Sequence, residues 1–142
     1  MSLVIDANLV ISIVLPLPYS EATKDKMLSW KQFGEVLLAP ALWEYEVTSA
    51  LRRGVFNGLL NAGQAASALS QLMLLNVHSI LPSETLNLQA LGWAERLGQT
   101  RAYDAQYLAL AEQAGVELWT ADQRLANRAK QAGVVWVHWV GE

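Results

Sequence analysis

The 142-residue chain contains no cysteine and only two histidines. The absence of cysteine excludes a disulfide framework and a thiolate zinc site. Long apolar runs are also missing. None approaches the roughly 18 residues that a transmembrane helix needs, so we expect no membrane partner. No basic segment precedes the first apolar run, so we expect no secretory signal and a location in the cytoplasm.

Charge is scarce as well. Charged residues make up 16% of the chain and the formal net charge is −3, whereas apolar residues make up 53%. A slightly acidic chain does not have the composition of a strong, non-specific nucleic-acid binder. The apolar content is high for a soluble domain, which indicates a surface for a partner or for a second copy of the chain.

Short apolar runs alternate with longer amphipathic ones. We expect strands at 3–6, 35–39, 77–81, 117–120 and 134–138, and helices at 8–15, 20–33, 40–56, 61–75, 83–97, 103–114 and 122–132. This alternation predicts an α/β fold, a three-layer sandwich with a mostly parallel central sheet and helices on both faces. The chain has no repeat and no linker, so we expect a single domain over residues 1–142.

Four aspartates are present, and three of them lie next to apolar segments. Asp25 belongs to the charged stretch SEATKDKM, which we interpret as a solvated helix face. Asp6 closes the first expected strand, and Asp122 follows the fourth by two residues. An open α/β sheet binds its ligands at the carboxyl ends of its strands, so these two acids could be neighbours in space. Each also fits the simpler role of N-cap for the helix that follows it.

Two further acids lie on expected helices. Asp104 is in the first turn of 103–114, where it is either a functional carboxylate or a favourable charge at the positive end of the helix. In the helix expected at 40–56, Glu46 borders the apolar stripe that contains Trp43 and Val47. Glu44 projects away from this stripe and fits a solvated face.

Considered together, the four acids indicate a cation site. Four carboxylates that converge on one pocket repel each other, and a bound cation relieves this repulsion. Oxygen ligands without cysteine or a well-placed histidine indicate Mg²⁺ or Mn²⁺ rather than zinc. Such an ion activates water and neutralises the charge of a phosphodiester, so the residues predict metal-dependent phosphodiester hydrolysis.

Four segments resemble the PIN-domain family in their order and spacing, namely LVIDAN, LAPALWEYEVTSALRR, YDAQYLALAEQAGVELWTADQRLA and the closing VVWV. Within this family they are most similar to VapC-type toxins of bacterial toxin–antitoxin pairs. The resemblance implies a compact α/β sandwich and endoribonuclease cleavage of RNA that depends on one or two Mg²⁺ or Mn²⁺ ions. It also implies a homodimer and a cognate antitoxin that blocks the acidic pocket.

The resemblance also implies roles for single residues. Asp6 matches the family's first-strand acid, and Glu46 matches the acid of its E-V-x-x-A-L helix. Asp104 matches the acid of Y-D-A, and Asp122 that of T-x-D. These four would hold the metal and serve as the catalytic residues, and Thr120 would hydrogen-bond within the cluster.

Five other residues have supporting roles in this interpretation. Asn8 fits a polar position near the first acid, and Ser49 stands where many members of the family carry asparagine. Arg101, Arg124 and Arg52 could guide the RNA backbone, although ordinary solvated helix charge explains them as well.

Two other classes of function remain to be weighed. A phosphatase with Asp6 as a covalent nucleophile is disfavoured, because that pattern requires a second aspartate where Asn8 stands. The alternative that stays open is a catalytically silent PIN-like module that binds protein or RNA, although the presence of all four acids weighs against it.

Overall fold

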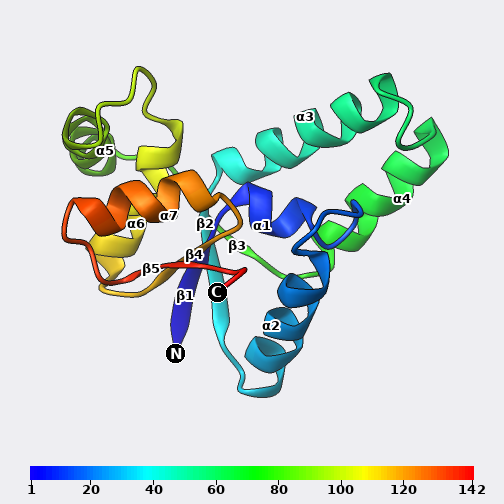
Figure 1. The fold of residues 1–142 in the computed structure, drawn as a ribbon, viewed down its shortest axis with the longest axis horizontal. Helices are drawn as coiled ribbons and strands as arrows, with labels where there is room; N and C mark the ends of the chain where they lie inside the picture. The colour runs from blue at the N-terminus through cyan, green and yellow to red at the C-terminus, as the bar shows by residue number, and fades with distance from the viewer.

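A five-stranded, all-parallel sheet forms the centre of the fold in the computed structural model, which describes residues 1–142 (Figure 1). The strands lie in the order β3-β2-β1-β4-β5. Their bounds are Ser2–Ile5 for β1, Val36–Pro40 for β2, His78–Ile80 for β3, Leu118–Thr120 for β4 and Val137–Trp139 for β5.

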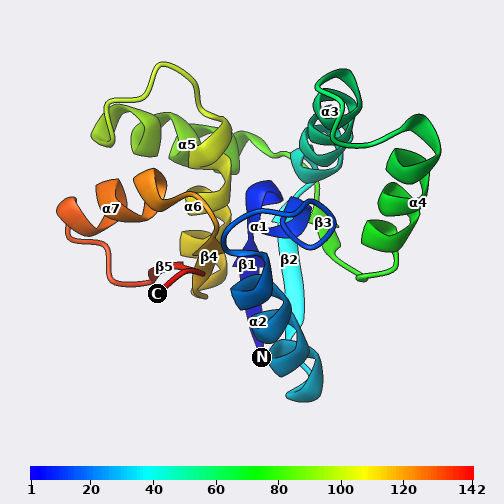
Figure 2. The ribbon, with the colours of Figure 1, turned by 45° about the vertical axis from the view of Figure 1, so that its right-hand side comes forward.

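Seven helices cover the two faces of this sheet. They are α1 (Ala7–Ile11), α2 (Ser20–Gln32), α3 (Leu42–Phe56), α4 (Ala62–Met73), α5 (Glu84–Arg96), α6 (Tyr103–Ala114) and α7 (Gln123–Gln131). Both ribbon views show α5, α6 and α7 on one side and α3 and α4 on the other, with β1 and β2 between the two groups (Figures 1 and 2). The predicted three-layer α/β sandwich is confirmed. None of the helices is long and apolar enough to span a membrane.

The strand order contains a reversal between β1 and β4. From β1 the chain proceeds outward to β2 and β3, then returns across the sheet to β4 and proceeds to β5 on the other side. In an open parallel sheet, the carboxyl ends of the strands at such a reversal border a crevice. The pairing of Ile5 with Trp119 sets the register here, and the Asp6 amide donates to the Trp119 carbonyl at 3.2 Å. The residues that follow Ile5 and Trp119 therefore meet at the edge of the crevice.

The core is built around β1 and α6. Val4 and Ile5 are fully buried because strands of a parallel sheet are covered on both faces. The segment from Ala105 to Ala111 in α6 is almost entirely buried and packs against β1, β2 and β4. Alanines at the contact let the helix approach the sheet closely. Since α6 is held this rigidly, its first turn has a fixed position above the strand ends.

Most predicted boundaries differ from the structure by one or two residues, and the helix expected at 8–15 ends earlier, at Ile11. Pro40 was expected to open a helix, but it ends β2, where it lies opposite Ile80 of β3. The missing Pro40 N–H is tolerated because the next amide, that of Ala41, donates to the Ile80 carbonyl at 2.9 Å. The last strand was expected at 134–138 but begins at Val137. The preceding residues form the connection after α7, from which the Trp136 carbonyl accepts from the Leu118 amide.

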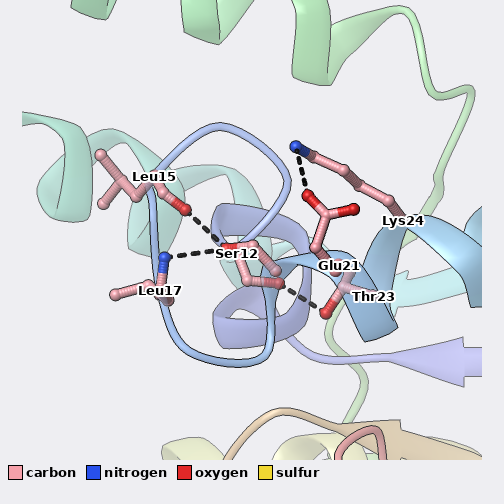
Figure 3. Close-up of polar contacts among 7 residues, drawn as sticks. Ser12, Leu15, Leu17, Glu21, Thr23 and Lys24 are labelled. Atoms are coloured by element: carbon pink, nitrogen blue, oxygen red, sulfur yellow. Dashed lines mark hydrogen bonds and ion pairs between the residues drawn. The ribbon is translucent and has the colours of Figure 1, made fainter.

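A set of buried hydroxyls fixes the connection between α1 and α2. The Ser12 and Thr23 side chains point toward each other, with their oxygens 2.7 Å apart (Figure 3). The Ser20 hydroxyl accepts from the Leu17 amide and donates to the Leu15 carbonyl, both at 2.9 Å. Because buried polar groups are costly unless paired, these bonds favour a single arrangement of the loop. They thereby hold α1, the helix that follows Asp6, in place.

Candidate active site

Asp6 is the most deeply buried acid, with 4% of its surface exposed. It is the N-cap of α1, and its Oδ1 accepts from the Leu9 amide at 2.8 Å. Its Oδ2 accepts a short hydrogen bond from the Thr120 hydroxyl. Burial raises the pKa of the Asp6 carboxyl from 3.8 to about 7, although the bonds from Thr120 and Leu9 favour its charged form. The Asp6 carboxyl is therefore only partly ionised at neutral pH, and a nearby positive charge would favour its charged form.

Thr120 connects Asp6 to Asp122. The Thr120 side chain is fully buried, and its hydroxyl oxygen also accepts from the Asp122 amide at 2.9 Å. Asp122 is the N-cap of α7, where its Oδ1 accepts from the amides of Arg124 and Leu125. The N-cap roles considered for Asp6 and Asp122 are thus present in the structure. In each case one carboxylate oxygen is engaged at the helix end.

Asp104 lies in the first turn of α6 and is half-buried. Burial raises the pKa of the Asp104 carboxyl, the nearby charge of Asp122 raises it further, and the Arg128 guanidinium lowers it. The Gln99 amide lies 3.5 Å from Asp104 Oδ2. Asp104 and Glu46 both line an open hollow of about 470 Å³, together with Gln99, Thr100, Arg101, Arg128, Tyr103 and Gly98.

Glu46 projects from α3 toward α6, where Tyr107 donates its hydroxyl proton to Glu46 Oε1 at 2.6 Å. Burial raises the pKa of the Glu46 carboxyl, and the charge of Asp104 raises it as well, whereas the Tyr107 bond and the Arg53 guanidinium lower it. Burial beside Glu46 also raises the pKa of the Tyr107 phenol, so Tyr107 stays protonated and acts as a donor. Glu44, in contrast, is exposed, as its helical position predicts.

Electrostatic influence joins the four predicted acids, although they come from separate segments of the chain. The charge of Asp104 raises the pKa values of both Asp6 and Glu46, and the charge of Asp122 raises that of Asp104. Only Glu46 and Asp104 line the hollow, and Asp6 lies buried beside Thr120. The structure therefore gathers four acids at the carboxyl edge of β1 and β4.

The predicted supporting residues occupy different places. Asn8 and Ser49 are exposed, and no side-chain hydrogen bond involves either of them. Arg101 lines the hollow, whereas Arg52 and Arg124 are exposed residues outside its lining.

Sequence reasoning missed four residues that contact or influence the acids: Tyr107, Gln99, Arg53 and Arg128. Helical spacing could have indicated two of them. Tyr107 follows Asp104 by three residues, and Arg53 follows Glu46 by seven, so each shares a helix face with its acid. Gln99 and Arg128 carry no such signal, because they approach Asp104 from a loop and from another helix.

The donor set determines which metal the site fits. The acids offer oxygen atoms alone, which suits Mg²⁺ or Mn²⁺, and the buried Asp6 carboxyl needs a cation in order to ionise fully at neutral pH. No three acidic or histidine side chains of the chain are already placed as a metal-binding group. The residues present thus fit a hard divalent cation by chemistry, in an arrangement that is not preassembled.

Fold and site together define a class of protein: a parallel α/β sandwich with a group of interacting carboxylates at its topological reversal. The sequence matches the PIN domain family over residues 3–131, and the chain belongs to this family. It is 33% identical to Ribonuclease VapC3 from Pyrobaculum aerophilum over 132 residues, which cover 90% of this chain and 95% of that protein.

Solved structures agree with the fold. VapBC2 from Rickettsia felis, bound to a DNA fragment from its promoter, superposes with a TM-score of 0.70 at 12% identity, over 98% of both chains. FitAcB from Neisseria gonorrhoeae superposes with a TM-score of 0.69 at 19% identity, over 99% of both chains. At these identities the likeness shows a shared fold.

Proposed function

We propose that the protein is a metal-dependent endoribonuclease that hydrolyses RNA phosphodiester bonds and is the toxin of a toxin–antitoxin pair. The observation that carries this proposal is the mutual electrostatic influence of Asp6, Glu46, Asp104 and Asp122 at one edge of the sheet. The 33% identity to a ribonuclease of the VapC type supports the choice of RNA as substrate.

In this proposal Asp6, Asp104 and Asp122 would hold one or two Mg²⁺ or Mn²⁺ ions, with Glu46 as a further ligand, directly or through water. A bound cation would supply charge neutralisation at the phosphate and activation of water. Each acid is supported by its own donor. Thr120 orients Asp6, Tyr107 orients Glu46, and Gln99 lies beside Asp104.

The charged groups of the hollow supply the attraction for RNA. Arg101 and Arg128 lie with the acids in its lining and can bind the phosphate backbone. Their local positive charge compensates for the net charge of −3 of the whole protein. Arg124 and Arg52 lie outside the lining and would contact the phosphate backbone farther along the RNA. Asn8 and Ser49 are close to Asp6 and Glu46 in the sequence, and their side chains are exposed. Their supporting role in this proposal is therefore a direct contact with the substrate.

We propose two protein partners, a cognate antitoxin and a second copy of this chain. Large apolar side chains are exposed on several elements, including Tyr45 and Phe56 of α3 and Leu88 and Leu91 of α5. Such groups gain stability when a partner covers them. We also propose that residues 1–142 act as a single domain and that the protein works in the cytoplasm, where RNA and an antitoxin are available.

A covalent mechanism at Asp6 stays disfavoured, because Asn8 stands where such a phosphatase requires its second aspartate. The remaining alternative is a catalytically silent binding module. A working metal site and a silent one differ in a measurable way, because only the first requires both the cation and the acids for cleavage.

The test is an RNA cleavage assay with structured and single-stranded RNAs in Mn²⁺, in Mg²⁺ and in EDTA. Cleavage is expected with either metal, none in EDTA, and none for Asp6→Asn or Glu46→Gln. The matched controls are Asp25→Asn and Glu44→Gln, which remove the same charges from exposed positions on α2 and α3. Intact RNA under every condition, or equal cleavage by Asp6→Asn, would overturn the proposal.

A further inference from the structure

A second cavity lies directly beside the acidic hollow. It is an apolar pocket of about 160 Å³ between the carboxyl ends of β2 and β3, the start of α3, and helices α5 and α6. Its lining comprises Pro40, Ala41, Leu42, Ile80, Pro82, Leu86, Tyr103, Gln106 and Leu110. Figure 2 shows that these elements meet at the end of the sheet where α3 begins. None of the acids takes part in this pocket.

Tyr103 belongs to both cavities, so it forms the boundary between them. Tyr103 is 58% exposed although the middle of helix α6 is buried, and it immediately precedes Asp104. On the pocket side, Tyr103, Gln106 and Leu110 follow one another at spacings of three and four residues and share a face of α6. Leu110 is 4% exposed and lies at the inner end of this face.

The walls of the pocket are preformed. Pro40 and Pro82 have fixed backbone angles, and neither presents an N–H that would need a partner. The bond from the Ala41 amide to the Ile80 carbonyl, at 2.9 Å, ties the two strand ends together. Binding of a ligand here therefore orders few protein groups, so little of its binding free energy is lost in ordering the protein.

Gln106 adds a polar side chain to this largely apolar lining, besides the hydroxyl of Tyr103. The Gln106 side-chain amide donates to Asn87 Oδ1 at 2.9 Å, which fixes its orientation. Its own carbonyl oxygen makes no hydrogen bond in the structure and is left as an acceptor. The pocket therefore offers apolar walls, one aromatic ring and one hydrogen-bond acceptor, which are the groups that recognise an unstacked base.

We propose that this pocket binds one unpaired base of a single-stranded RNA, next to the phosphate that enters the acidic hollow, with Tyr103 as its stacking surface. A nucleotide joins an anionic phosphate to a planar, weakly polar base. The two adjacent cavities match these parts, since the hollow contains Arg101 and Arg128 and the pocket is apolar. This inference rests on the proposed ribonuclease function and adds a site that selects the position of cleavage.

Gln106 gives the pocket a preference among bases. Because its free group is an acceptor, a base that presents an amino or imino donor to it is favoured over one that presents only carbonyl oxygens. Changing Gln106 to leucine should leave stacking intact and remove this preference. Tyr103 thus supplies affinity, and Gln106 supplies selection.

The test uses single-stranded RNAs of eight nucleotides, each with 2-aminopurine at a different position. The fluorescence of this base falls when it stacks on an aromatic ring. Binding in Mn²⁺ is followed by stopped flow before cleavage proceeds. We expect quenching at one position of the RNA for the wild type and for Tyr103→Phe. Tyr103→Ala should lose the quenching and bind roughly 5- to 150-fold more weakly, the change that corresponds to one stacked base.

Two controls keep the result specific. Phe33→Ala removes an exposed aromatic ring from the end of α2, outside the lining of both cavities, and should leave quenching, affinity and cleavage position unchanged. Gln106→Leu should retain the affinity and broaden the bases accepted at the quenched position. Melting curves of each variant confirm that it is folded, which we expect because Tyr103 and Phe33 are both largely exposed.

The outcomes separate this inference from the proposed function. If the wild type cuts no RNA, the ribonuclease proposal fails, and the quenching experiment by itself decides whether the pocket binds a base. If RNA is cut but Tyr103→Ala binds, quenches and cleaves as the wild type does, the base pocket is refuted. A change in the oligomeric state of Tyr103→Ala with all RNA readings unchanged also refutes it, since the pocket would then belong to a protein interface.

Discussion

Replacing Asp6 by asparagine should stabilise the protein when divalent metal is absent and remove its response to metal when metal is added. The physical reason is the burial of the Asp6 carboxyl, which raises its pKa from 3.8 to about 7. A charge that is disfavoured in the folded state lowers the free energy of unfolding. Asparagine has nearly the same shape and carries no charge.

The magnitude follows from the shift in pKa. A difference of about three pKa units corresponds to roughly 4 kcal/mol at a pH near or above the folded value. Asparagine recovers less than this, because its NH₂ group replaces an oxygen that accepts from Thr120 or Leu9, at a cost of about 1–3 kcal/mol. The net gain is therefore about 1–3 kcal/mol, which raises Tm by roughly 3–10 °C for a chain of this size.

The sign of the pH dependence is fixed by the direction of the shift. Below pH 3.8 the Asp6 carboxyl is protonated in both states, so its charge costs nothing. Between pH 3.8 and about 7 the unfolded chain has released this proton and the folded protein still holds it, so the stability of the wild type falls as pH rises. The advantage of Asp6→Asn should accordingly reach its full size near pH 7 and disappear near pH 4, where the cost of the amide leaves the variant no more stable than the wild type.

The assay is thermal and urea unfolding of both proteins from pH 4 to 8, in EDTA and in Mn²⁺. At a free metal concentration about 100 times Kd, the wild type should gain roughly 2.7 kcal/mol, whereas Asp6→Asn should gain much less. The control is Asp25→Asn, which removes an exposed charge from α2. If Asp6→Asn unfolds more readily than the wild type at pH 7 in EDTA, or if their difference does not change with pH, the account of Asp6 is wrong.

Three further predictions concern other parts of the molecule. Tyr107→Phe removes the 2.6 Å bond to Glu46 and should cost about 1–3 kcal/mol in urea unfolding together with a loss of cleavage, whereas unchanged values in both assays would show that the bond is unimportant. Arg128→Gln should weaken RNA binding and reduce by about 1 the slope of the logarithm of the binding constant against the logarithm of the salt concentration. An unchanged slope would show that Arg128 makes no phosphate contact. Gly115→Ala should lower the free energy of unfolding by about 1 kcal/mol, because Gly115 has φ +67°. Gly92→Ala should raise it by roughly 0.5–1 kcal/mol, because Gly92 lies inside α5 with open space around it. Equal effects of the two substitutions would contradict this argument.

The succession of strands and helices follows from local sequence signals. Apolar runs, glycines after helices and capping residues before them placed all twelve elements with small errors at their ends. Two of these errors arise where local and tertiary signals conflict. Pro40 is typical of a helix start, but pairing with β3 extends the strand through it, and the sequence around 134 is apolar enough for a strand that has no partner there.

The acids were recognisable as a set before their arrangement was known. Their positions at strand ends and in first helical turns indicated Asp6, Asp104 and Asp122, and helical periodicity separated Glu46 from the exposed Glu44. The identity of their partners was not recognisable in this way. Thr120 and Asp6 are 114 residues apart, and no local pattern predicts their hydrogen bond.

By itself, then, the sequence determined the fold class, the family and the residues capable of binding a hard cation, because these depend on periodicity and residue chemistry. Only the tertiary structure decided how the acids are supported and where a substrate could lie. The register of β1 against β4 brings Thr120 to Asp6, and the packing of α6 on the sheet brings Tyr107 to Glu46 of α3. The position of α6 also places Tyr103 between two cavities. These contacts join segments far apart in the chain, so they arise only when the sheet and its helices are assembled.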